Sequence, residues 1–233
     1  MNDKNFKKFQ PKSKSTPKTK PSKQSYQDFF QKYLHKSLGL KTYQKIGIGF
    51  LIFVIAGFIG WLYEFLLAWA EHGEIYMKGG NLLPWINIYA FGALLIIPLT
   101  WKIRKYPWAV FLASVLITGT LELLGGWLVY TIGNGTRYWN YDYGIWQIGS
   151  LNGFVCLTSV TAFGLSALLL MYGVLPLCIR LATKMSKRWF IILATSLFVL
   201  VLADELINLT LKNLNQPNAM DFYTSLGLKY QSF

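Results

Sequence analysis

The chain has 233 residues, of which 53% are hydrophobic and 14% are charged, and its formal net charge is +13. Soluble domains carry about 25% charged residues, so this composition excludes an ordinary soluble globular fold and favours a membrane protein. Twelve of the 23 basic residues lie within the first 45 positions. The positive charge therefore belongs to a terminal arm and does not indicate a nucleic-acid-binding fold.

The N-terminal arm falls into two parts. Residues 1–25 are rich in Lys, Ser, Thr, Pro and Gln, and they bury too little apolar surface to fold, so we predict a disordered arm. Within residues 26–45, apolar side chains recur at helical spacing between lysines. This pattern predicts an amphipathic helix, which either lies on the membrane surface or packs beneath the membrane domain. The lysines of the arm are expected to bind anionic lipid of the inner leaflet.

Five apolar stretches follow, with at most two charged residues in each: 46–70, 85–101, 107–132, 151–179 and 189–211. About 20 helical residues cross the hydrocarbon core of a bilayer. The sequence therefore predicts an all-α, polytopic integral membrane protein, with a five-helix transmembrane bundle over residues 46–211. The second stretch lies at the lower limit of that length. Tryptophans, Trp85 among them, mostly lie near the ends of these stretches, as in an aromatic belt.

Basic residues are distributed unevenly between the segments that flank these stretches. Alternate segments hold 19 and 4 Lys or Arg residues. The positive-inside rule therefore predicts a multi-pass protein of the cell membrane with a cytoplasmic N-terminus. The same rule makes the tail over residues 212–233 extracytoplasmic.

Four carboxylates lie inside the predicted spans, where an ionised group costs at least about 2.5 kcal/mol. They are Glu64, Glu122, Asp204 and Glu205, and Asn208 lies one helical turn beyond the last two. Glycines share the helix faces of the first two, so these should lie where helices pack closely. We predict one shared, outward-facing acidic site that binds a cation or an amine, or carries a coupling proton. Alternatively, these carboxyls only hold the bundle together.

The loop over residues 133–150 is predicted to face the mouth of this site. It is rich in aromatic and polar side chains, among them Tyr138, Trp139, Asn140, Tyr141, Asp142, Tyr143 and Trp146. This composition suits a sugar, a quaternary amine or a lipid headgroup. The aromatic girdle of an ordinary interfacial loop is the simpler explanation.

Several sequence motifs that mark nucleotide-binding, metal-binding and hydrolytic sites are absent. The sequence has no GxxxxGK[ST] phosphate-binding loop and no HExxH, CxxC or GxSxG motif, and both of its histidines lie outside the predicted spans. We therefore expect no enzyme, no cofactor and no bound metal. An intramembrane enzyme that uses Glu64 and Glu122 ranks last, because no nucleophile–base pair is visible.

Five short motifs occur in a particular order: GWLYE at 60–64, PWINIYAFGA at 84–93, LELL at 121–124, WNY at 139–141 and LNGFVCL at 151–157. This set resembles the bacterial CmpB-like family of type IV ABC-transporter permeases over about residues 46–180. The resemblance implies a membrane component served by a separate ATPase. It also adds Tyr63 and Asn152 to the candidate site residues.

The chain departs from the family pattern at three positions. Asn140 stands where the family usually has Asp, Phe154 where it has Arg, and Asn87 where it has Pro. The joint loss of an Asp and an Arg indicates that an ion pair is missing, for which Asp142 is a candidate replacement.

We therefore predict solute translocation by a permease subunit or small transporter, with Glu64 and Glu122 as the binding or coupling site. Asp204 and Glu205 would lie at its outer mouth. The alternative is a non-transporting envelope factor that binds a lipid headgroup or a partner membrane protein through the aromatic loop and the arm. Five spans are few for a pore, so a homodimer is a further possibility. The short inner loops leave little surface for an ATPase.

Overall fold

The structure is a computed structural model that describes residues 23–35, 38–73, 76–78, 81–135, 137, 139–142 and 147–231. The arm up to residue 22 and the loop aromatics Tyr138, Tyr143 and Trp146 lie outside these residues. The chain divides into two units, the first ending at Ser37 and the second beginning at Leu38. Each unit is described by itself.

The first unit contains helix α1 (Lys23–His35). The aromatic rings of Phe29 and Phe30 each contact the ring of Tyr33, with centroids 6.4 and 5.8 Å from it. The helix expected within residues 26–45 is therefore present, although it begins at Lys23 and ends at His35. Its position on a membrane surface stays a prediction.

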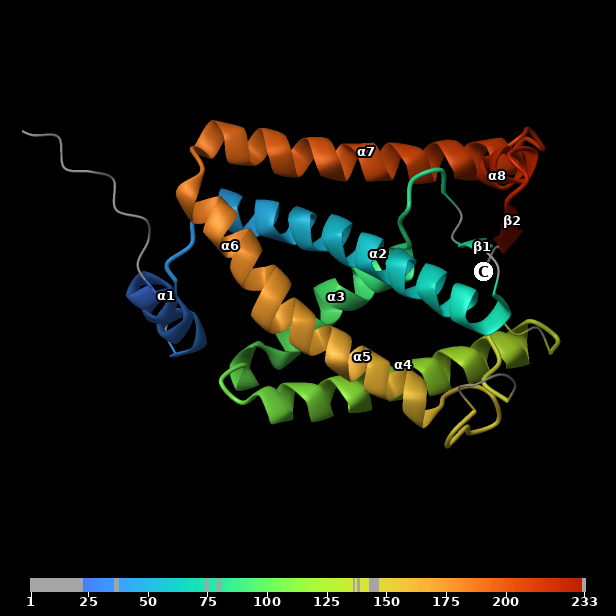
Figure 1. Cartoon of the computed structure of the whole chain (residues 1–233), viewed down its shortest axis with the longest axis horizontal. Coiled ribbons are helices and arrows are strands. Elements are labelled where there is room, and N and C mark those ends of the chain that lie inside the picture. The colour runs from blue at the N-terminus through green and yellow to red at the C-terminus, as the bar shows by residue number, and fades with distance from the viewer. Residues whose placement is uncertain are drawn as a thin grey trace, which may run out of the picture. The chain divides into compact units, whose positions relative to one another are not determined.

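The second unit is built from apolar helices (Figure 1). They are α2 (Thr42–His72), α3 (Asn87–Thr100), α4 (Pro107–Ile132), α5 (Leu157–Leu169) continued through one π-helical turn by α6 (Leu175–Lys184), and α7 (Lys187–Asn213). Within the described chain, α2, α4, α5–α6 and α7 are long and apolar enough to cross a membrane. The helix formed by α3 and its 3-10 extension (Trp101–Ile103) is shorter. The predicted all-α membrane fold is confirmed.

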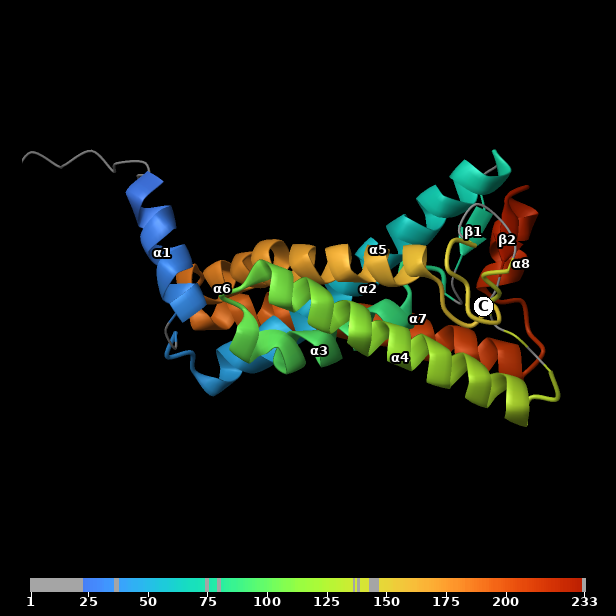
Figure 2. The same cartoon turned by 90° about the horizontal axis from the view of Figure 1, so that it is seen from below.

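Successive apolar helices run in opposite directions, so the second unit has two ends (Figure 1). We call the end with residues 38–41, 101–106 and 185–186 the turn end, and we call the end at which α2, α4 and α7 finish and α5 begins the loop end. A short helix, α8 (Ala219–Ser225), lies at the loop end. So do two three-residue strands, β1 (Tyr76–Lys78) and β2 (Lys229–Gln231), which pair in parallel. Figure 2 shows this end from below.

Helix α2 is the central helix of the second unit and packs against α3, α6 and α7. Its glycines allow this close approach. A Cβ atom on Gly57 would lie 2.0 Å from Nε1 of Trp85, and one on Gly60 would lie 2.2 Å from the ring of Tyr89. The glycine face that the sequence indicates on this helix is therefore a packing face.

The second apolar stretch enters the bundle without helical structure. Helix α3 begins only at Asn87, and the N–H of Ile86 donates to the carbonyl oxygen of Gly57 on α2 (3.1 Å). Trp85 is 4% exposed and packs with Phe53 in a buried cluster, so its expected place in an aromatic belt is wrong. We call residues 81–86 the lead-in segment. Its backbone reaches the level of Gly57, in the middle of a helix long and apolar enough to cross a membrane, and polar groups at such a level require protein partners.

The contact of Gly57 with the lead-in segment gives a first prediction. Gly57→Ala should lower stability by about 1–3 kcal/mol, because the added methyl group overlaps the indole of Trp85. Gly49→Ala is the matched control on the same helix, since a Cβ atom there meets nothing within 4 Å. Thermal unfolding of the purified chain in mild detergent measures both. Equal melting temperatures for the two variants would contradict the packing described here.

Candidate functional site

Glu64 lies on α2, one turn beyond Gly60, and its Oε1 accepts a hydrogen bond from the hydroxyl of Tyr89 on α3. Tyr89 reaches this position because Gly60 has no side chain. The Tyr89 ring also contacts Phe163 of α5 and Tyr63 of α2, with centroids 6.0 and 6.2 Å apart. The candidate residue Tyr63 therefore packs against the tyrosine that binds Glu64.

Glu122 lies on α4 and binds two hydroxyl groups. Its Oε1 accepts from Tyr141 (2.6 Å) and its Oε2 from Ser159 on α5 (2.8 Å). Burial, and then the charge of Glu122, raise the pKa of the Tyr141 phenol, so this hydroxyl keeps its proton and acts as the donor. The loop between α4 and α5 is thereby tied to the bundle at Glu122.

The two carboxylate–tyrosine pairs lie in one neighbourhood. Tyr89, which binds Glu64, packs against Phe163 of α5, and Ser159, one turn earlier on the same helix, binds Glu122. Glu64, through Tyr89, and Glu122, through Ser159, are therefore both linked to neighbouring turns of α5. Tyr89 and Ser159 were not among the predicted site residues. That both carboxylates serve one ligand stays a prediction.

The loop between α4 and α5 is organised around Arg137. Its guanidinium donates to the carbonyl oxygen of Asn152 (2.8 Å) and to Oδ1 of Asn140 (3.3 Å). It also forms an ion pair with Asp142 (3.7 Å) and lies 4.8 Å from the ring centroid of Phe154. Asp142 thus carries an ion pair in this loop, as a replacement for the missing one would.

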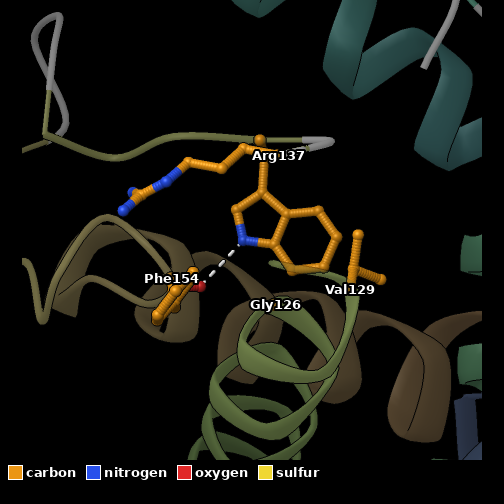
Figure 3. A pocket seen from close by; sticks show the side chains of 5 residues that line it. Gly126, Val129, Arg137 and Phe154 are labelled. Atoms are coloured by element: carbon orange, nitrogen blue, oxygen red, sulfur yellow. Dashed lines mark hydrogen bonds between the residues drawn. The ribbon is translucent and has the colours of Figure 1, made fainter. Parts of the chain in front are cut away.

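The residues beneath Arg137 enclose a narrow gap that has no space for a water molecule (Figure 3). It is lined by Gly126, Val129, Arg137, Trp139 and Phe154. The indole N–H of Trp139 donates to the carbonyl oxygen of Phe154 (2.8 Å), and a Cβ atom on Gly126 would lie 2.9 Å from the Phe154 ring. The described contacts of Trp139, Asn140, Asp142 and Asn152 therefore shape the loop itself.

Asp204 on α7 binds the lead-in segment. Its carboxylate accepts the backbone N–H groups of Leu82 (3.3 Å) and Leu83 (2.8 Å). The side-chain amide of Asn208 also donates to it (2.8 Å), while the Oδ1 of Asn208 accepts the N–H of Ala219 on α8 (3.0 Å). Asp204 therefore satisfies backbone donors that non-helical structure leaves without a partner.

Glu205 binds two asparagine side chains, one at the start of the lead-in segment and one at the start of α3. Its Oε2 accepts from the side-chain amide of Asn81 (2.7 Å) and its Oε1 from that of Asn87 (3.2 Å). Proline, which the family usually has at position 87, could not supply this donor. The described hydrogen bonds of Asp204 and Glu205 thus go to residues 81–87 and Asn208. None of them goes to Glu64 or Glu122.

The described residues contain no group of three or more His, Cys, Asp or Glu side chains that could hold a metal ion. Residues 51–209 match the model of the family described as "Putative ABC-transporter type IV" (CmpB). The chain belongs to this family. The match includes three of the five apolar stretches completely and most of the first and last, and it reaches beyond the motif region to Asp204 and Glu205. No curated protein and no solved structure matches the chain significantly.

The role of Asp204 gives a second prediction. Asp204→Ala leaves two backbone N–H groups without an acceptor inside the bundle, and each such group costs about 1–3 kcal/mol. We expect a lower melting temperature, together with faster maleimide labelling of a cysteine placed at Leu83. Glu205→Gln keeps an acceptor oxygen and should change both readouts much less. Unchanged labelling at position 83 in Asp204→Ala would show that other contacts hold the segment.

Proposed function

We propose that this CmpB-family protein moves a small solute across the cell membrane as a permease subunit or small transporter. Glu64 and Glu122 are its binding or coupling site in this proposal. The family supports an ABC-transporter-type membrane protein. One observation supports the residue assignment: carboxylates from two different apolar helices are each bound by a tyrosine hydroxyl, and α5 contacts both groups, through Phe163 at Tyr89 and through Ser159 at Glu122.

The chemistry of the partners supports a site that gains and loses charge. The described partners of Glu122 are two neutral hydroxyl groups. A hydroxyl both donates and accepts hydrogen bonds, so it can bind either the carboxylate or the protonated carboxyl. If a buried carboxylate were instead paired with a cation, its protonation would leave that cation buried without a counter-charge. Glu122 can therefore exchange a proton, or bind an ammonium group, without losing the groups that position it.

The distribution of basic residues supports an assignment of the side of the membrane that this site faces. Nine of the thirteen described basic residues of the second unit lie at or near the turn end: Lys41, Lys45, Lys102, Arg104, Lys105, Arg180, Lys184, Lys187 and Arg188. The positive-inside rule places this end in the cytoplasm. The loop end, with the tyrosines that bind the carboxylates, would then face the outside, and the Lys-rich arm would meet anionic lipid of the inner leaflet.

An ATPase subunit, which the family description implies, would have to bind the turn end. The connection over residues 101–106 is the longest described surface between spans at this end. The hydroxyl of Tyr172, in the π-helical turn between α5 and α6, donates to the carbonyl oxygen of Arg104 (2.7 Å). A displacement of residues 101–106 by such a subunit would therefore be transmitted directly to α5–α6. Helix α5 carries Ser159, which binds Glu122.

The third prediction tests the two carboxylates. In proteoliposomes under an imposed pH gradient, Glu64→Gln and Glu122→Gln should each reduce pH-dependent uptake of radiolabelled methylammonium at least about tenfold, the effect of losing about 1.4 kcal/mol. Interior pyranine reports accompanying proton movement. Asp28→Asn removes an exposed carboxylate on α1 and should leave uptake unchanged.

Melting temperatures distinguish function from packing. Variants that stay folded but lose uptake support the site. Wild-type uptake in both Gln variants would reject it and leave Glu64 and Glu122 as packing residues. A folded wild-type chain that moves neither methylammonium nor protons favours the non-transporting envelope factor instead.

A further inference from the structure

An open cavity of about 660 Å³ lies at the loop end, and neither Glu64 nor Glu122 is among the residues that line it. Helix α7, α8 and the lead-in segment form its walls, through Leu82, Asn208, Leu211, Asp221, Phe222 and Ser225 among others. Cavities of roughly 300–1,000 Å³ are typical of small-molecule sites. The contacts that position the tyrosine-bound carboxylates do not use these residues.

Hydrogen bonds hold the walls of this cavity in place. The backbone N–H of Ala219, the first residue of α8, donates to the buried side chain of Asn208 (3.0 Å). The hydroxyl of Tyr223 donates to the carbonyl oxygen of Leu82. Strand β2, which follows α8, pairs with β1. Helix α8 is thus bound to α7 and to the lead-in segment. Specific hydrogen bonds therefore define the walls of the cavity.

The lining combines one negative charge with an apolar wall. Among the described residues that line the cavity, Asp221 is the charged one and none is Lys or Arg; Asn208, Asn218 and Ser225 add neutral polar groups. Leu211 and Phe222 form the apolar side. Leu211 lies one helical turn beyond Ile207, which is 53% exposed on α7. An apolar path therefore leads from the cavity along the membrane-spanning helix.

We propose that this cavity binds the cationic head of an amphiphile, an alkylammonium group whose hydrocarbon chain leaves along α7. Asp221 supplies the charge that attracts the ammonium group. The membrane interface would lie at the end of α7. The ammonium head of the ligand would bind at this level, and its hydrocarbon chain would extend from there into the membrane. The same chemistry occurs in lipids with amine headgroups and in amphipathic amines. This site is independent of the transport role proposed for Glu64 and Glu122.

Photolabelling of the full chain in phosphatidylglycerol nanodiscs tests this site. The probes are a dodecyltrimethylammonium and a dodecyl sulfate, each with a diazirine in the chain, and peptide mapping locates the label. We expect the ammonium probe to label residues 207–225 preferentially and the sulfate probe not to do so. Suppression by phosphatidylethanolamine in the nanodisc would assign the site to a lipid headgroup. Unchanged labelling would assign it to an amphipathic amine.

Two variants test the site from different sides. Asp221→Asn removes the charge but keeps an oxygen that can accept the N–H of Asn218 as Asp221 does, so α8 should stay folded. It should reduce labelling of residues 207–225 about fivefold, as expected for a partly exposed ion pair. Ser225→Trp fills the cavity and leaves the charge in place, and it should reduce labelling as well.

Asp28→Asn is the matched control and should label like the wild-type chain. Labelling that is undiminished in both cavity variants would overturn the proposal. So would equal labelling by the sulfate probe, or label spread along α4 and α7 without enrichment near α8.

Discussion

A backbone N–H group at membrane depth needs a partner within the protein, because hydrocarbon offers none. In this chain the lead-in segment brings non-helical backbone to the level of Gly57 on α2, and Asp204 on α7 accepts the N–H groups of Leu82 and Leu83. This interaction allows α3 to be short. It also fixes Trp85 against Gly57, and Trp85 leads directly into the helix that carries Tyr89, the partner of Glu64.

The pattern of apolar residues and glycines was sufficient to predict the membrane fold and the packing faces. Gly57 and Gly60 do meet bulky side chains of a neighbouring segment, and Gly126 meets Phe154. Hydrophobicity also placed the helices correctly to within a few residues at most boundaries. Both successes rest on local periodicity, which depends only on which residues lie three or four positions apart.

Partners from distant parts of the chain were not predictable in this way. Trp85, at the end of an apolar stretch, has the sequence position of a belt residue, yet Phe53 and α7 bury it. Asp204 and Glu205 looked like members of the same site as Glu64, but their hydrogen bonds go to residues 81–87 and Asn208. A clue was present in the sequence: the second apolar stretch is short for a span, and asparagines lie at and before its start. Such a stretch needs polar partners from another helix.

The distance along the chain between the lead-in segment and its acceptor has a consequence for biogenesis. Leu82 and Asp204 are separated by 122 positions, and all the later apolar helices lie between Leu82 and that carboxylate or contain it. Helices leave the ribosome and enter the translocon one after another, so the second apolar stretch emerges long before its acceptor exists. The N–H groups of Leu82 and Leu83 can therefore bind Asp204 only after α7 has been synthesised.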